Sequence, residues 1–312
     1  MWLNVILSSV VALILAGSVF AETRTPNELE RKIDSLFVIA SSGEVRFRDL
    51  NKPAMDSIAA LGAPAVPYLI EKFTTKSARE RWTVIWILQR IGSPAVPDLV
   101  QALGRSNGLV VQRVCWALGD IKDTAAVEPL IEICTHLRWQ VREQALGALG
   151  KISDKRGGSA AASRLDDSIG QVRKAAAVTC GKLEYHRCIP VLVHLLGDDF
   201  YGARMSAMEA LLKLDTADVI TVLCDSINST NCLVGDMTCH ILGRIGNDEA
   251  MLILLEQTKS DNPDRRAHAA VALVNADPRD NCGFQARVLE RETDRLVLLK
   301  IQSAISTVIN GQ

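Results

Sequence analysis

The sequence is poor in aromatic residues and has no marked excess of charge of either sign. Phe, Trp and Tyr together make up 4% of its 312 residues, and 35 Lys and Arg stand against 36 Asp and Glu. The formal net charge of -1 argues against the overall basic field that usually supports binding to DNA or RNA. We therefore expect no nucleic-acid partner, and the overall charge does not require an acidic partner either.

The short motifs of common enzyme classes are also absent. The sequence has no glycine-rich phosphate loop, no HExxH, no paired CxxC and no nucleophile elbow. From these absences we expect no catalytic residue, no metal and no cofactor. Apolar material is abundant, however, since 48% of the residues are hydrophobic, which is enough for a continuous core.

The first residues contain an uncharged apolar run, NVILSSVVALILAGSVF, followed by Ala21. Together with Val19, this residue gives the pattern that precedes a cleavage site, so the run predicts a secretory signal peptide over residues 1–21. The alternative is a retained membrane anchor over residues 3–20, because the run is nearly long enough to span a bilayer. In both cases we expect the rest of the chain outside the cytoplasm, periplasmic or secreted, with no stable membrane insertion after removal of the leader.

The rest of the sequence repeats in steps of 31 residues. One column of this lattice holds leucine in five units and cysteine in one: Leu118, Leu149, Cys180, Leu211, Leu242 and Leu273. The next column holds four glycines, with Leu212 and Val274 replacing glycine in the other units: Gly119, Gly150, Gly181 and Gly243. A fixed period of this length is typical of a repeat architecture.

Each unit has the pattern of two helices. In one unit Val141, Ala145, Leu149 and Ile152 lie on one helical face, and the preceding segment 126–134 predicts a shorter helix with proline in its first turn. A single hairpin cannot bury both apolar faces, so neighbouring units must stack. We expect N-terminal capping helices over residues 22–60, repeats over 61–276 and C-terminal capping helices over 277–312.

The phrases LGxPAVPxL, at 61–69 and 91–99, and VRxxAxxALGxI, at 141–152, resemble HEAT repeats of the short type first associated with phycobilisome lyases. This resemblance covers about residues 55–276 and implies an all-α, right-handed α-solenoid. Function is implied only weakly, because that family includes chromophore lyases, a hydroxylase and scaffolds without chemistry. The hydroxylase ligates iron through His-Glu dipeptides, and none of the five histidines here is followed by glutamate.

One column of the second helices mixes large and polar residues, which predicts that it faces outward on the concave side of the solenoid. It contains Trp86 and Trp116, and continues to Glu209 and His240; Trp82 lies one helical turn before Trp86. Tryptophan is enriched among residues that dominate binding energy. These residues are our candidate partner-binding surface, although the tryptophans are also suited to filling gaps beneath an N-terminal cap.

Charged residues recur in two further columns. A basic ladder ends the second helices and is explained either by the helix dipole or by an anionic partner: Arg90, Lys151, Lys182, Lys213 and Arg244. Acidic residues precede arginines by six residues in the pairs Asp167 with Arg173 and Asp198 with Arg204, and Arg142 occupies the same column. The family resemblance implies that such Asp and Arg residues link neighbouring repeats.

Two local features complete the expectations. Cys224 and Cys239 would lie on the facing helices of one hairpin and form the first candidate for a disulfide, although most cysteines here occupy columns of buried apolar residues. The segment 156–165, RGGSAAASRL, has only small residues where other units have Leu, Ile or Val. It predicts a bend between two stacks, with closer packing as the alternative.

Two functions remain open. The first is an exported, non-enzymatic scaffold that binds a protein or peptide on its concave face. The second is an enzyme or small-ligand binder of the phycobilin-lyase-like type that uses the region of Trp82, Trp86 and Trp116. A confined pocket with a titratable group beside the tryptophans would favour the second.

Overall fold

The computed structural model describes residues 27–276 and 292–309, and this part of the chain is helical without any strand. The predicted all-α solenoid is thus confirmed. The described part of the chain begins with α2 (Glu28–Ala40) and α3 (Asn51–Ala59), which pack against each other across the loop that contains the short helix η1 (Val45–Phe47). The predicted leader, residues 1–21, lies outside the described residues.

Seven hairpins follow, each with a shorter first helix and a second helix that packs against it. The first helices are α4 (Val66–Glu71), α6 (Val96–Ala102), α8 (Val127–Ile133), α10 (Gly158–Ala162), α12 (Ile189–Leu195), α14 (Thr216–Ser226) and α16 (Asp248–Gln257). The second helices are α5 (Ala78–Ile91), α7 (Gly108–Ile121), α9 (Trp139–Ile152), α11 (Gly170–Lys182), α13 (Tyr201–Leu211), α15 (Cys232–Ile245) and α17 (Pro263–Ala276). The helix α19 (Arg295–Ile309) packs on α17 and closes the described chain.

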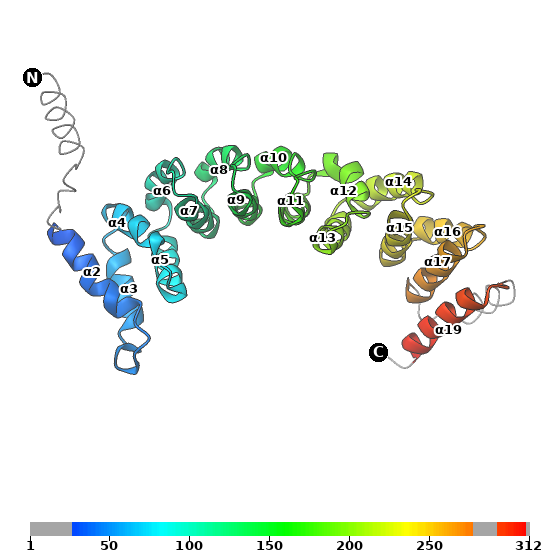
Figure 1. Ribbon diagram of the computed structural model, residues 1–312, viewed down its shortest axis with the longest axis horizontal. Coiled ribbons are helices and arrows are strands. Elements are labelled where there is room, and N and C mark those ends of the chain that lie inside the picture. The colour runs from blue at the N-terminus through cyan, green and yellow to red at the C-terminus, as the bar shows by residue number, and fades with distance from the viewer. Residues whose placement is uncertain (1–26, 277–291, 310–312) are drawn as a thin grey trace, which may run out of the picture.

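The hairpins form an arch, with the first helices on its outer side and the second helices on its concave side (Figure 1). A core of buried apolar residues runs between the two layers through all of the hairpins. Among the described residues no helix is both long and apolar enough to cross a membrane.

The glycine column sets how closely the second helices stack. A Cβ atom on Gly119 would lie 2.8 Å from Ala148 Cα, and one on Gly181 would lie 2.8 Å from Ala210 Cα. At Gly243 the nearest atom would be Ala272 O, at 2.9 Å. Real Cβ atoms do not approach other atoms this closely, so these second helices are in contact only because glycine has no side chain.

At two of the joints, that is, the contacts between second helices of neighbouring hairpins, this glycine is missing and the two helices pack less closely. Leu212 stands in the glycine column at the end of α13, and α13 has almost no close backbone contact with α15. The units are linked there mainly by α12 and α14, as the gap between α13 and α15 in Figure 1 also shows. Gln89 occupies the corresponding place in α5, which packs less closely on α7 than α7 does on α9.

Of the two alternatives for residues 156–165, a bend or closer packing, the structure favours closer packing. The second helices on either side of this segment, α9 and α11, stack closely, as do α11 and α13. The small residues allow close packing, because the space beside Gly158 is filled by the Tyr185 ring and the space beside Gly157 by Leu149 and Leu183.

We predict that the same substitution at two glycines has opposite effects on stability. Gly119→Ala should lower the free energy of unfolding by about 1 kcal/mol, because overpacking against Ala148 outweighs the gain in helix propensity. Gly147→Ala is the matched control, since its Cβ would meet nothing within 4 Å, and it should raise stability by up to about 1 kcal/mol. Urea denaturation followed by circular dichroism measures both, and equal effects would contradict a packing role for Gly119.

Candidate functional site

The tryptophans lie together at the N-terminal end of the concave side. Trp82 is 58% exposed, whereas Trp86 and Trp116 are half-buried and pack against the core. The rings of Trp82 and Trp116 meet edge to face, with their centroids 4.6 Å apart and an angle of 82° between the planes. One aromatic surface thus spans the open joint between α5 and α7, and Trp82 is its most exposed member.

Cations cover two of these rings. The guanidinium of Arg90 lies over Trp86, 5.5 Å from the ring centroid, and Lys151 Nζ lies 5.9 Å from the centroid of Trp116. Both cations are paired with carboxylates as well, so they are held in place beside the rings. A cation over an aromatic face is stabilised by the ring quadrupole, and it also occupies the position that a cationic ligand would take.

A cleft of about 510 Å³ opens beside Trp82 and Trp86. The loop after α2, the helix α3 and the first half of α5 form its walls: Ala40, Ser42, Gly43, Glu44, Val45, Arg48, Asn51, Met55, Arg79, Trp82, Thr83 and Trp86. Asn51 fixes the loop, because its side-chain amide donates hydrogen bonds to Ile39 O, Ala40 O and Ser42 O at 2.9 to 3.2 Å. Sequence analysis did not find this cleft, since its loop belongs to no repeat and carries no motif.

Glu209 and His240 do not join the tryptophans, because they lie on α13 and α15 near the other end of the arch. Both side chains are exposed, and Glu209 accepts a hydrogen bond from Arg244 at 2.8 Å. Partial burial and the charge of Arg244 lower the pKa of His240, while Glu209 acts in the opposite direction. The ion pair of Glu209 with Arg244 bridges the open joint between α13 and α15 on the concave side.

The basic ladder is largely paired. Arg90 binds Asp56 at 3.0 Å, Lys151 binds Asp120 at 2.6 Å and Arg244 binds Glu209 at 2.8 Å. Asp120 and Glu209 lie on the second helix of the preceding hairpin, and Asp56 lies on α3, before the first hairpin. Asp120, which interrupts the ladder in sequence, is the partner of Lys151. Lys182 and Lys213 are exposed and have no carboxylate partner within the described residues.

A second set of arginines connects neighbouring hairpins. Arg142 binds Asp167 through two hydrogen bonds, from Nε at 2.8 Å and Nη2 at 2.7 Å. Arg173 binds Asp198 in the same way, at 2.6 and 2.7 Å, and donates from Nη1 to the backbone oxygen of Asp167 at 2.8 Å. Each of these aspartates therefore holds arginines from two successive hairpins. Paired guanidinium and carboxylate groups of this geometry are among the strong hydrogen-bonding interactions.

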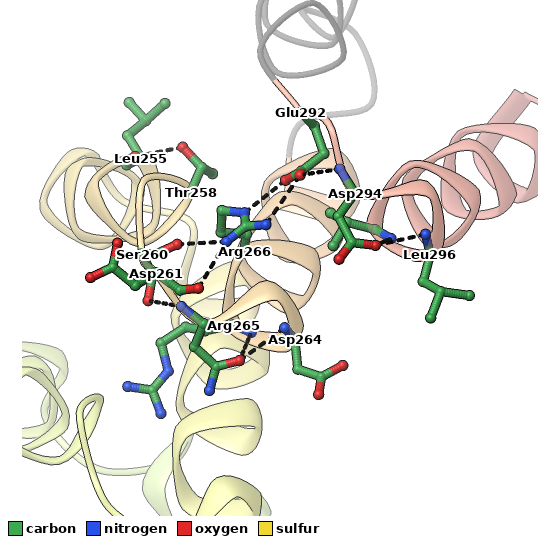
Figure 2. Close-up of polar contacts among 12 residues, drawn as sticks. Leu255, Thr258, Ser260, Asp261, Asp264, Arg265, Arg266, Glu292, Asp294 and Leu296 are labelled. Atoms are coloured by element: carbon green, nitrogen blue, oxygen red, sulfur yellow. Dashed lines mark hydrogen bonds and ion pairs between the residues drawn. The ribbon is translucent and has the colours of Figure 1, made fainter.

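The same link recurs at the C-terminal end of the described chain (Figure 2). Arg266 pairs with Glu292 through Nε at 2.8 Å and Nη2 at 3.2 Å, and donates from Nη1 to the carbonyls of Ser260 and Asp261. Glu292 lies just before α19, so this pair fastens the closing helix to α17. The predicted capping segment 277–312 is described only from residue 292 to 309.

The series of arginine–aspartate links is interrupted between α13 and α15. Arg204 donates to Asp198 O at 2.5 Å but has no carboxylate partner among the described residues. The next position of the arginine column is Gly235, and Arg265 fills the space beside it and donates to Asn228 Oδ1 at 3.0 Å. A hollow of about 300 Å³ lies between these two hairpins, next to Ser229 and Val234.

The linking aspartates are more acidic than ordinary aspartates. Burial alone would raise the pKa of Asp198, but hydrogen bonds from Arg173 and the Phe200 N–H, together with the charge of Arg173, outweigh it and lower the pKa. For Asp167 the pKa is likewise lowered, because Arg142 and the Ile169 N–H outweigh burial. Both carboxylates are therefore charged and paired at neutral pH.

The cysteines do not form the disulfide considered from the sequence. Cys224 and Cys239 are both free: Cys239 is fully buried in α15, while Cys224 is only partly buried in α14, near the charges of Glu249 and Asp225. Burial raises the pKa of Cys239 to about 12, so its thiol is not reactive at neutral pH. In the described parts of the chain no group of three or more His, Cys, Asp or Glu side chains is placed to hold a metal ion.

Stacked helical hairpins with a regular concave surface define this protein as an α-solenoid, in which each hairpin contacts mainly its neighbours. The family model of HEAT repeats matches residues 96–178 and 158–232. Residues 96–232 therefore consist of HEAT repeats, as the repeated phrases indicate.

Comparison with solved structures gives distant likenesses. The chain is 18% identical to human deoxyhypusine hydroxylase in complex with glycerol (80% of this chain and 97% of that chain, TM-score 0.35). It is 16% identical to a chain of the CpcE and CpcF complex of phycocyanin lyase from Nostoc sp. PCC7120 (78% and 94%, TM-score 0.42). It is 18% identical to YibA of Escherichia coli (82% and 96%, TM-score 0.49). No curated protein matches the sequence, and these likenesses are too weak to carry a function over.

We predict that Asp198→Ala lowers the free energy of unfolding by about 2 kcal/mol at pH 7, because it leaves the largely buried guanidinium of Arg173 without its main partner. The neighbouring substitution Asp199→Ala is the control, since Asp199 also binds Arg173 but its side chain is 93% exposed; it should cost less than about 1 kcal/mol.

The pH dependence follows from the lowered pKa of Asp198. A carboxylate with a lowered pKa in the folded state stabilises the protein above its unfolded pKa of about 3.9, and this contribution is lost as the pH falls through the lower, folded value. The difference in stability between wild type and Asp198→Ala, measured by urea denaturation, should therefore shrink below about pH 4. A difference that is unchanged down to pH 2 would contradict the charged pair.

Proposed function

We propose that this HEAT-repeat protein is an exported scaffold that binds a protein or peptide at the N-terminal end of its concave side. The observation that carries the proposal is the aromatic surface of Trp82, Trp86 and Trp116 beside the open cleft. In a sequence with 4% aromatic residues, three of the five tryptophans gather there, and Trp82 is 58% exposed. Exposed tryptophan beside a cavity is a common anchor of protein interfaces.

The position of the surface supports a macromolecular partner. It lies on the inner side of an arch built from seven hairpins, where an extended segment can contact several second helices at once. Arg90 and Lys151, the cations beside the rings, are held in ion pairs. The aromatic side chains therefore lose little conformational freedom when a partner binds. Preorganisation of this kind lowers the entropic cost of binding.

The second candidate is a small-ligand binder or an enzyme that uses the same region, of the phycobilin-lyase-like type. The cleft volume of about 510 Å³ favours this candidate, since it falls within the range of small-molecule sites. Glu44, the carboxylate that lines the cleft, is bound by Arg46 at 2.6 Å. A purified protein that retains a small molecule would separate the two functions.

We predict export with cleavage of the leader. The protein purified from its native source should begin at Glu22, because residues 4–20 form the apolar run and Ala21 ends the predicted cleavage site. Cell fractionation followed by N-terminal sequencing is the measurement. A chain that begins at Met1 in the membrane fraction would indicate the anchored alternative, and a full-length chain in the cytoplasm would contradict export.

We predict that Trp82→Ala weakens partner binding about 30-fold, since loss of an interface anchor costs 2 kcal/mol or more. The tagged mature chain, residues 22–312, is used to capture partners from the envelope or secreted fraction of its source. The affinity of each purified partner for wild type and variant is then measured by calorimetry. Because Trp82 is largely exposed, the variant should keep its fold, which circular dichroism checks.

Leu137→Ala is the matched control for Trp82→Ala. Leu137 is 97% exposed, in the turn before α9, so the variant removes an exposed apolar side chain away from the aromatic surface. It should bind the partner like wild type. Equal affinities of wild type and the Trp82 variant would move the binding surface elsewhere, and a retained small molecule without any protein partner would support the second candidate.

A further inference from the structure

The cleft beside Trp82 has an apolar wall and an uneven charge. Trp82, Trp86 and Met55 form the wall, and three charged residues, Glu44, Arg48 and Arg79, lie around it. Because the two sides of the cleft differ in chemistry, they restrict what can bind there.

The cationic groups of the cleft lack carboxylate partners. Arg48 is exposed and has no side-chain partner among the described residues, and Arg79 only donates one hydrogen bond from Nη1 to the backbone oxygen of Ser42 at 3.2 Å. The negative charge of Glu44 is already matched, because Arg46 binds it at 2.6 Å. Two guanidinium groups therefore remain uncompensated at the cleft.

The tryptophans reinforce this preference. Arg90 already covers one face of Trp86, and a cationic ligand in the cleft would meet the repulsion of Arg48 and Arg79. An apolar side chain has neither penalty, and a carboxylate matches the guanidinium groups in geometry and charge.

We propose that the cleft binds a peptide segment that presents a carboxylate next to an apolar side chain. The apolar side chain packs on Trp82 and Trp86, and the carboxylate pairs with Arg48 and Arg79. This assignment rests on the proposed function, and it names the chemistry of the partner at that site. The carboxylate comes either from an Asp or Glu side chain or from the end of a peptide chain.

The test uses the full mature chain and four pools of synthetic octapeptides with the same randomised apolar positions. The first pool carries one Asp or Glu and an amidated end, and the second a free C-terminal carboxylate without acidic residues. The third carries one Lys or Arg with an amidated end, and the fourth is neutral and amidated. Fluorescence anisotropy gives the affinity of each pool.

We expect one of the two carboxylate pools to bind at least tenfold more tightly than the neutral pool, with the cationic pool weakest. The stronger carboxylate pool identifies the source of the group. Arg79→Gln should remove about tenfold of that affinity and leave the neutral pool unchanged. Arg187→Gln is the matched control, because Arg187 is an exposed arginine of the distant turn η7 (His186–Cys188) and its loss changes the net charge equally.

The other outcomes overturn the assignment. Equal or stronger binding of the neutral or cationic pool contradicts a carboxylate ligand, and so does an equal effect of Arg79→Gln and Arg187→Gln. If no pool binds while a captured partner still depends on Trp82 and not on Arg79, the carboxylate assignment fails and the proposed function stands. If neither the pools nor any partner depends on Trp82, both fail.

Discussion

The close approach of successive second helices is the constraint on which the rest of the structure depends. It is possible at Gly119, Gly181 and Gly243, where a Cβ atom would collide with the backbone of the next helix, and at Gly150, where a Cβ atom would lie 3.2 Å from Thr179 Oγ1. Where glycine is present, the second helices of neighbouring hairpins pack closely against each other. Where Gln89 or Leu212 takes its place, the helices separate.

The exposed column of the concave side follows the same constraint. At the tight joints around α9 and α11 it holds the small residues Gly147 and Val178. At the two open joints it holds large neighbours: Trp86 and Trp116 between α5 and α7, and Glu209 and His240 between α13 and α15. One open joint is thus covered by aromatic rings and the other by an ion pair, which gives the two ends of the arch different surfaces. The cleft lies at the aromatic end, where a wider joint leaves room for large side chains.

The sequence predicted the repeat and the hairpins, because both depend on a local period of apolar residues. It left open whether the tryptophans face outward or fill gaps, and Trp86 and Trp116 are half-buried against the core while Trp82 is exposed. Other features depend on which residues meet across units. The small residues at Gly157 and Gly158 suggest poor packing when this unit is considered alone, but Tyr185 and Leu183 fill the space beside them. Likewise, the ladder cations look unpaired until Asp56, Asp120 and Glu209 are placed on the preceding helices. The cleft could not be predicted, because the loop that forms one of its walls is not part of a repeat unit and contains no known motif.

The near-neutral charge of the whole chain does not oppose an anionic ligand at the cleft. At physiological ionic strength exposed charges act over about 8 Å, so binding depends on the local balance and not on the net charge of -1. Along the arch several cations, among them Arg142, Lys151 and Arg173, pair with a carboxylate of a neighbouring hairpin, and these pairs cancel locally. Arg48, in the loop after α2, and Arg79, near the start of α5, have no carboxylate partner within the described residues. These two cations are thus available at the cleft, beside the rings that give the surface its apolar contact area.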